Sequence, residues 1–181
     1  MILIGIGANL PNLNFGPPRA TCGAALEKLE KIGISIHKRS QWYRTEPVPV
    51  SSDPWYVNGV VAVITDLRPH DLMKQLLRIE ENLGRKRSKS SQSRTIDLDI
   101  LAYHDRVVQE EAKNGVQLQI PHPRMHERGF VLIPLADIFP KWIHPSLGQT
   151  ARELIDNLQD SQKTAMMADA RGYLGTEWGI N

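Results

Sequence analysis

Two carboxylates stand two residues apart in the segment Arg-Thr-Ile-Asp-Leu-Asp-Ile at positions 94–100. Side chains alternate between the two faces of a β-strand, so on a strand Asp97 and Asp99 share one face, with Cα atoms about 6.5–7 Å apart. Carboxylate oxygens at this spacing can converge on one or two hard cations such as Mg²⁺. The alternative is an ordinary solvated strand face, where the two carboxylates bind nothing.

A basic, serine-rich loop precedes the carboxylates. Residues 85–94 contain five cations and no acidic residue, and Arg85, Arg87 and Arg94 are among them. Arginine forks neutralise phosphoryl oxygens, and a loop of small polar residues can close over a ligand. The alternatives are a plain charged loop and a nucleic-acid contact, although a nucleic-acid patch usually interleaves aromatic side chains. Because Mg²⁺ held by two carboxylates typically also binds substrate phosphates, the loop and the carboxylates together favour a metal–triphosphate site.

A third cluster crowds four potential phosphate donors into seven residues, His122, Arg124, His126 and Arg128, in a frame of prolines. A histidine by itself is usually structural and does not indicate a general acid. Its alternation with arginines here favours phosphate binding.

A ring and an amide stand two residues apart in the β-prone segment 56–65. Tyr56 and Asn58 share one face of this segment and adjoin a proline-rich loop, residues 45–55. A flat ring beside an amide that both donates and accepts hydrogen bonds suits a heteroaromatic ligand. A half-buried pair of strand residues is the alternative.

Hydrophobic periodicity predicts the elements that must position these side chains. The predicted strands span residues 2–8, 34–42, 56–65 and 96–103, and the predicted helices span residues 17–32, 69–83 and 150–158. The order β-α-β-β-α-β predicts an α+β sandwich of the ferredoxin-like kind, with a mainly antiparallel sheet and helices packed on it. Residues 1–158 form the predicted domain, and residues 159–181 form a peripheral C-terminal extension.

Composition and missing motifs narrow the range of functions. The chain has 181 residues, a net charge of +2 and one cysteine, Cys22, which excludes an intrachain disulfide and a cysteine-based zinc site. A phosphate-binding Gly-x-x-x-x-Gly-Lys loop is missing, and the glycines at 5 and 7 lack the third glycine of a dinucleotide site. Every apolar run is shorter than the roughly 20 residues of a membrane span. We expect a soluble, cytoplasmic protein that binds neither membranes nor nucleic acid.

Six motifs, in this order, resemble the 6-hydroxymethyl-7,8-dihydropterin pyrophosphokinase family over about residues 1–158. They are G-A-N-L at 7–10, Y-R-T-E-P at 43–47, Y-V-N at 56–58, R-I-E-x-x-L-G-R at 78–85, R-T-I-D-L-D-I at 94–100 and P-H-P-R-M-H-E-R-G-F at 121–130. The last two blocks together are highly specific for the family, whereas the first is weak on its own.

The resemblance implies transfer of the β,γ-pyrophosphoryl group of ATP to the pterin hydroxymethyl oxygen, with release of AMP, in folate biosynthesis. It implies two Mg²⁺ ions bridged by Asp97 and Asp99, and it implies catalytic roles for Arg85 and Arg94. Nucleotide-contact positions of the family are occupied by Glu80, Arg87, Ile100, His122 and Arg128. Pterin-contact positions are occupied by Asn9, Thr45, Pro47, Val48, Tyr56, Asn58 and Phe130. We expect a monomer whose partners are these small-molecule substrates.

Three features depart from the family pattern. Many members carry Trp-Gly-Pro before the aspartate block, where this chain has Ser-Gln-Ser at 91–93. The glycine common after Glu-Pro-Val is Pro49, and the chain continues beyond Leu158 to residue 181. The first departure concerns closure of the loop over the pterin rather than the metal site. A non-catalytic pterin or nucleotide binder and an RNA-binding module are the alternative functions.

Overall fold

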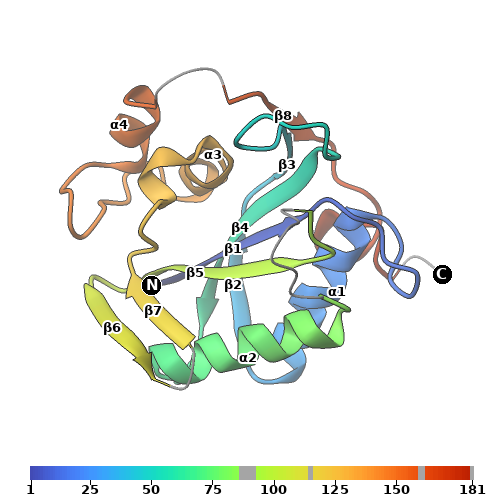
Figure 1. Ribbon diagram of the computed structural model, residues 1–181, viewed down its shortest axis with the longest axis horizontal. Coiled ribbons are helices and arrows are strands. Elements are labelled where there is room, and N and C mark those ends of the chain that lie inside the picture. Colours follow the sequence, from blue (N-terminus) through green and yellow to red (C-terminus); the bar gives the residue numbers. More distant parts are fainter. Residues whose placement is uncertain (86–92, 114–115, 159–161, 180–181) are drawn as a thin grey trace.

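The computed structural model describes residues 1–85, 93–113, 116–158 and 162–179 (Figure 1). The strands are β1 (Ile2–Ala8), β2 (Ser35–Arg39), β3 (Trp42–Thr45), β4 (Tyr56–Ile64), β5 (Asp97–Tyr103), β6 (Val108–Lys113), β7 (Val116–Ile120) and β8 (Thr164–Met167). The helices are α1 (Pro18–Lys31), α2 (Pro69–Asn82), α3 (Gly129–Ile138) and α4 (Ala151–Asp156), with 3₁₀ turns at Met125–Glu127 and Tyr173–Gly175. The predicted mixture of helices and a mainly antiparallel sheet is confirmed.

The main sheet has the strand order β5-β1-β4-β3-β8, and its pairings are antiparallel. The single strand predicted over residues 34–42 is instead two strands, β2 and β3, which both pair with β4. The strands separate at Ser40, whose hydroxyl accepts a hydrogen bond of 3.0 Å from Val60 N while its own N–H donates to Val60 O. The Ser40 hydroxyl thus takes the place of a backbone carbonyl in the β-ladder, so the chain can bend between β2 and β3. Strands β6 and β7 form a separate hairpin.

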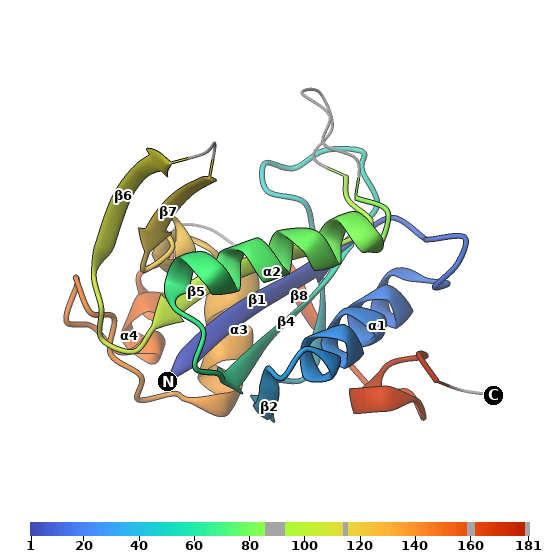
Figure 2. The same cartoon turned by 90° about the horizontal axis from the view of Figure 1, so that it is seen from below.

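Helices α1 and α2 bury one face of the central strands (Figure 2). Ile4 and Ile6 of β1 and Leu98 and Ile100 of β5 point to this side and are at most 2% exposed. Removal of this apolar surface from water contributes about 1.5–3 kcal/mol for each fully buried side chain. The helix-covered face therefore anchors the strands that carry the aspartates.

Helix α3 covers one end of the opposite face. Val131 and Leu135 of this helix share a second apolar cluster with Leu3 and Leu101 of the sheet. The sequence did not predict α3, because its residues are almost all apolar and include Pro134, so no amphipathic stripe marks the helix. The other end of this face, which carries the aspartates, is left for a ligand.

Helix α2 ends in a turn that places the first arginine of the basic loop. Gly84 has a φ of 80°, in the left-handed region that glycine adopts without a Cβ penalty. The turn returns the chain toward the helix, so that Arg85 N donates a hydrogen bond of 3.0 Å to Glu80 O. Arg85 is thereby held beside β5.

The C-terminal segment adds an edge strand and packs on α1. Strand β8 pairs with β3, and Trp178 packs against the core beside Phe15, with ring centroids 5.5 Å apart. Trp42 Nε1 donates to Leu174 O at 3.0 Å. Across the described parts of the chain, no helix has the length and apolarity needed to span a bilayer.

Candidate active site

Strand β5 presents both carboxylates to the face that α3 leaves open. Asp97 and Asp99 alternate with buried Leu98, as their spacing predicted. Strand β1 places Gly7 opposite Asp97 and Gly5 opposite Asp99. Because glycine has no side chain, the backbone of β1 can approach a ligand closely here.

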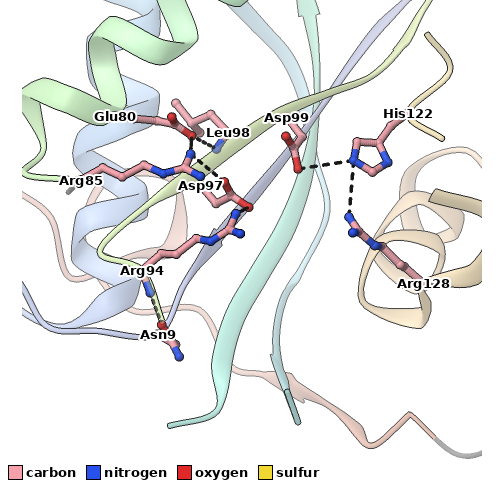
Figure 3. A network of polar contacts seen from close by, with 9 residues as sticks. All are labelled: Asn9, Glu80, Arg85, Arg94, Asp97, Leu98, Asp99, His122 and Arg128. Carbon is pink, nitrogen blue, oxygen red and sulfur yellow. Dashed lines mark hydrogen bonds and ion pairs between the residues drawn. The ribbon is translucent and has the colours of Figure 1, made fainter. Parts of the chain in front are cut away.

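Asp97 is the centre of an ion-pair network (Figure 3). Its carboxylate lies 2.8 Å from Arg85 Nη1 and 2.5 Å from Arg94 Nη1. Arg85 also pairs with Glu80, which is 1% exposed and accepts a hydrogen bond of 2.7 Å from Leu98 N. Burial raises the pKa of Glu80 to about 7, against the opposing effects of that hydrogen bond and of Arg85. Glu80 thus ties α2 and Arg85 to β5 behind the carboxylates.

Asp99 faces His122, with Oδ2 and Nε2 3.9 Å apart (Figure 3). Burial and the charge of Asp97 raise the pKa of Asp99 to about 6, although its side chain keeps 38% of its exposure and its charge is partly screened. Burial, followed by the charge of Arg128, lowers the pKa of His122 to about 4. The backbone N–H of Arg124 donates to His122 Nδ1 at 3.2 Å, and Arg128 Nη1, also a donor, lies 3.5 Å from Nε2. At neutral pH His122 is therefore uncharged.

A cavity of about 400 Å³ opens beside the carboxylates, a size typical of small-molecule sites. Its wall brings together many of the predicted site residues from β3, β4, β5, the proline-rich loop and the segment around the start of α3. They are Thr45, Val48, Tyr56, Asn58, Arg94, Asp97, Asp99, His122, Arg128 and Phe130. The fold therefore joins the predicted phosphate and heteroaromatic subsites into one continuous site.

The end of the cavity formed by Thr45, Asn58 and Phe130 has an amide held in place by a hydrogen bond. Asn58 Nδ2 donates a hydrogen bond of 2.7 Å to Thr45 Oγ1, and both residues are buried. Asn58 Oδ1 lies over Gly7, where an added Cβ would stand 2.7 Å from it. Phe130 contributes an aromatic ring, with the Arg128 guanidinium 5.4 Å from the ring centroid. Polar edges and flat apolar surface therefore meet in one pocket.

Asn9 joins the proline-rich loop to the base of the basic loop. Its Oδ1 accepts a hydrogen bond of 2.6 Å from Arg94 N, and its Nδ2 donates to Pro54 O at 3.0 Å and to Ser93 Oγ at 3.1 Å. Ser93 Oγ in turn donates to Asp53 Oδ1 at 2.9 Å. Asn9 thus acts behind the cavity wall, through the backbone of the two loops.

The other predicted residues lie away from the wall. Glu80 and Arg85 stand behind Asp97, as described above. The Ile100 side chain is in the core on the helix-covered face, and Pro47 is buried in the proline-rich loop. Arg87 falls in 86–92, outside the described residues.

Three of the four predicted phosphate donors between 122 and 128 line the cavity, namely His122, Arg124 and Arg128. His126 instead packs edge-on against His144, with ring centroids 5.9 Å apart. His126 lies within the 3₁₀ turn Met125–Glu127, which directs its side chain away from the cavity. Alternation along a sequence therefore did not guarantee a shared direction in this irregular segment.

Sequence reasoning missed the floor of the cavity, which Gly5 and Gly7 form together with Leu101 and Val131. The signal was present in β1, where Leu3, Gly5 and Gly7 alternate with a buried isoleucine face. Two glycines on one face of a strand mark a close backbone approach. The partner strand could not be identified from that pattern, because strand pairing is a long-range property.

The carboxylate pair fits a divalent metal that shares its ligands with a substrate. Burial and then repulsion by Asp97 raise the pKa of Asp99, and a cation between the two carboxylates would relieve the repulsion. Within the described residues, groups of three or more His, Cys, Asp and Glu side chains do not gather into a self-sufficient metal centre. Mg²⁺ commonly binds one or two carboxylates together with water and substrate phosphates, and Asp97 and Asp99 fit the carboxylate part of that donor set.

Comparisons with known proteins agree with this geometry. The family model for 7,8-dihydro-6-hydroxymethylpterin-pyrophosphokinase (HPPK) matches residues 3–140. The chain belongs to the HPPK family. A 2-amino-4-hydroxy-6-hydroxymethyldihydropteridine pyrophosphokinase of Methylorubrum extorquens is 38% identical over 159 residues, covering 87% of this chain and 93% of the relative. The enzyme of the same name from Synechocystis sp. is 36% identical over 157 residues, or 86% of this chain and 75% of the relative.

Solved structures share the HPPK fold. The wild-type HPPK-DHPS of Plasmodium falciparum superposes with a TM-score of 0.65 at 17% sequence identity, over 86% of this chain and 44% of that chain. At this identity the likeness shows the fold alone. This chain spans less than half the length of that Plasmodium protein.

Proposed function

We propose that this chain transfers the pyrophosphoryl group of ATP to 6-hydroxymethyl-7,8-dihydropterin and releases AMP, the reaction of its family in folate biosynthesis. The observation that carries the proposal is the arrangement of Asp97 and Asp99 beside Arg94 on one wall of the cavity that also contains Tyr56 and Asn58. An acidic pair, cations and an aromatic–amide pocket are the three features that a metal-bound triphosphate and a pterin require.

The pterin occupies the end of the cavity formed by Thr45, Asn58, Tyr56 and Phe130. The Asn58 amide, held by Thr45, supplies complementary hydrogen bonds to the edge of the bicyclic ring. The aromatic rings of Tyr56 and Phe130 offer flat surfaces for its faces. Val48 and the backbone of Pro47 complete this end of the site.

The triphosphate occupies the charged end. Asp97 and Asp99 would hold two Mg²⁺ ions, which would neutralise charge on the phosphoryl oxygens when bound. Arg94 and Arg128 bind phosphate oxygens directly, and the neutral His122 ring lines the site beside them. The resemblance assigns nucleotide contacts to Glu80, Arg87 and Ile100. In this fold Glu80 acts through Arg85, and Ile100 takes part only through its backbone, because its side chain lies in the core.

The chemical step requires positioning and charge compensation more than covalent help from the protein. The pterin hydroxymethyl oxygen forms a bond to the β-phosphorus of ATP and releases its proton to solvent. The bond from that phosphorus to the bridging oxygen breaks, and AMP leaves with that oxygen. Arg85 and Arg94 compensate the charge that develops on the phosphoryl oxygens and on the departing AMP. Asn9 keeps Arg94 and the proline-rich loop in register during this step.

The remaining assignments concern the frame of the site. The order β5-β1-β4-β3 supports a ferredoxin-like core in which β2 and β3 together serve as one strand. Residues 1–158 carry the substrate contacts. Residues 159–181 are an extension, of which β8 lies at the edge of the sheet. The protein acts as a monomer in the cytoplasm.

A direct assay tests the proposed reaction. Purified protein, ATP, Mg²⁺ and 6-hydroxymethyl-7,8-dihydropterin are expected to yield AMP and the pterin pyrophosphate in equal amounts, measured by chromatography with mass detection. Omission of the pterin or chelation of Mg²⁺ abolishes AMP formation. Tight binding of both substrates without AMP would instead identify a non-catalytic binder, and the proposed function would be wrong.

A further inference from the structure

The C-terminal segment touches both sides of the cavity. One side is the end of β3 with Thr45, and the other is the start of α3 with Arg128 and Phe130. Residues 162–164 contact the backbone of both sides, although they lie beyond residues 3–140, which match the family model.

The Gln162 side chain clamps the backbone on either side of Arg128. Its Nε2 donates a hydrogen bond of 2.9 Å to Glu127 O, and its Oε1 accepts one of 2.7 Å from Gly129 N. Gly129 is the first residue of α3, so its N–H has no acceptor within the helix. One amide therefore satisfies groups immediately before and after a cavity arginine.

The contact is close as well as bidentate. A Cβ added at Gly129 would lie 3.2 Å from Gln162 Oε1 and 3.5 Å from Gln162 Cβ. The absence of a side chain at Gly129 lets the amide lie flat against the backbone. The clamp consequently fixes the direction in which the Arg128 side chain leaves the chain.

The same segment holds the opposite side of the cavity through β3. Glu46 N donates to Lys163 O at 3.1 Å, and Thr45 pairs with Thr164 in the β3–β8 ladder. Thr45 is the residue that fixes Asn58. Gln162 thus lies two residues before β8, the strand that pairs with β3 on the other side of the cavity.

We propose that Gln162 is a positioning residue that aligns Arg128 with the triphosphate by clamping the backbone at Glu127 and Gly129. This inference rests on the proposed role of Arg128 in binding ATP. The arginine reaches the phosphates next to His122, whose Nε2 lies 3.5 Å from Arg128 Nη1. A shift of α3 by a fraction of an ångström would separate the guanidinium from its target, because charge-assisted hydrogen bonds depend steeply on geometry.

The test compares Gln162→Ala with wild type by calorimetry, using a non-hydrolysable ATP analogue with Mg²⁺, and by steady-state kinetics. Gln162→Ala is expected to weaken binding of the analogue and to raise KM for ATP by about 10-fold, while KM for the pterin changes by less than about 3-fold. In an Arg128→Ala background the same substitution is expected to cost less than about 2-fold, because the positioned group is gone.

A local control and a conservative variant separate positioning from general stability. Lys163→Ala removes an exposed ion pair to Glu46 at 3.2 Å but keeps the backbone contacts, so nucleotide affinity should stay at the wild-type value. Gln162→Glu keeps an acceptor for Gly129 N–H and loses the donor to Glu127 O. Its affinity relative to wild type should recover as the pH falls toward about 5, because a protonated carboxyl regains a donor.

Several outcomes would overturn the proposal. The first is a change below 2-fold in analogue affinity and in KM for ATP in Gln162→Ala. The second is an undiminished effect of that substitution in the Arg128→Ala background. The third is a loss of affinity in Gln162→Glu that does not depend on pH. If Gln162→Ala does not fold, the Gln162→Glu pH series still decides the matter. Absence of AMP formation by wild type would refute the proposed function, whereas analogue binding would continue to test the clamp.

Discussion

One face of β1, β4 and β5 is packed with Ile, Leu and Val side chains beneath α1 and α2, whereas the other carries glycine, amide and carboxylate groups around the cavity. The strands are the same, and successive residues alternate between the two environments. Leu98, 2% exposed, stands between Asp97 and Asp99. The difference shows that a strand can devote one face to stability and the other to chemistry within a few ångströms.

Glu80 connects the helix-covered face of the sheet to the open face. It belongs to α2, is almost fully buried, and still binds Leu98 N and Arg85. A buried carboxylate needs such partners, because removal from water without them is costly. The helix-covered face thus supplies a support for the ion pairs of the open face.

The largest expected effect is that of Asp97→Asn, which tests whether the open face serves chemistry and not stability. We expect the rate of AMP formation to fall by about 10³-fold or more, because the charge of the metal pair contributes several kcal/mol. The melting temperature should change by no more than a few degrees, since Asp97 lies on the open face. Asp105→Asn, at an exposed position after β5, is the matched control and should retain full activity. Near wild-type turnover of Asp97→Asn would refute the metal assignment.

Leu98→Ala should give the reverse pattern. Loss of this buried side chain is expected to lower the free energy of unfolding by about 2–5 kcal/mol, measured by urea denaturation. Well below the transition, kcat should remain within a few-fold of wild type, because the side chain points away from the substrates. A large kcat defect in fully folded protein would show that the two faces are not separable.

Gly7→Ala tests the glycine floor. The new Cβ would lie 2.7 Å from Asn58 Oδ1, so the amide must move, and we expect KM for the pterin to rise by about 10-fold. KM for ATP should change little. If the cause is displacement of Asn58, Gly7→Ala should add almost nothing in an Asn58→Ala background. Equal effects on both substrates would point instead to distortion of the strand.

The smallest expected effect is on the pH dependence of the stability of the ligand-free protein. His122 has its pKa lowered from 6.5 to about 4, so between these values the unfolded chain binds more protons and stability falls as the pH falls. Asp99 has its pKa raised from 3.8 to about 6, so the folded chain binds more protons there and the sign is opposite. The free energy of unfolding, measured by urea denaturation, should therefore fall less between pH 7 and pH 4.5 in His122→Gln than in wild type. In Asp99→Asn it should fall more than in wild type. The same slope in both variants would contradict this assignment.

The regular parts of the molecule were predictable because their signals are local. Alternation in β1 and β5 and the apolar stripe of α2 identified those elements, and the spacing of Asp97 and Asp99 placed them on one face. Helix α3 was not predictable, because an apolar segment with Pro134 has no helical stripe. The bend at Ser40 depends on Val60, a contact that no local pattern reveals.

The site was predictable in its residue types and less so in its arrangement. The motifs identified the cavity residues, but His126 turned toward His144, and the wall formed by Gly5, Leu101 and Val131 emerged only from the packed structure. Gln162 lies in a segment without periodicity, and its partners are more than thirty residues away. Such contacts follow from the fold and not from neighbours in the sequence.

Arg85 and Arg94 already neutralise Asp97 before any nucleotide arrives. Under the proposed function, nucleotide binding would exchange counterions: Arg94 would leave the carboxylate of Asp97 for phosphate oxygens, and the carboxylate would receive a cation. Salt weakens the ion pairs that are broken as well as those that are formed. The affinity for ATP should consequently depend less on ionic strength than the number of charges in the site suggests, and the ligand-free protein avoids the cost of an unbalanced acidic pocket.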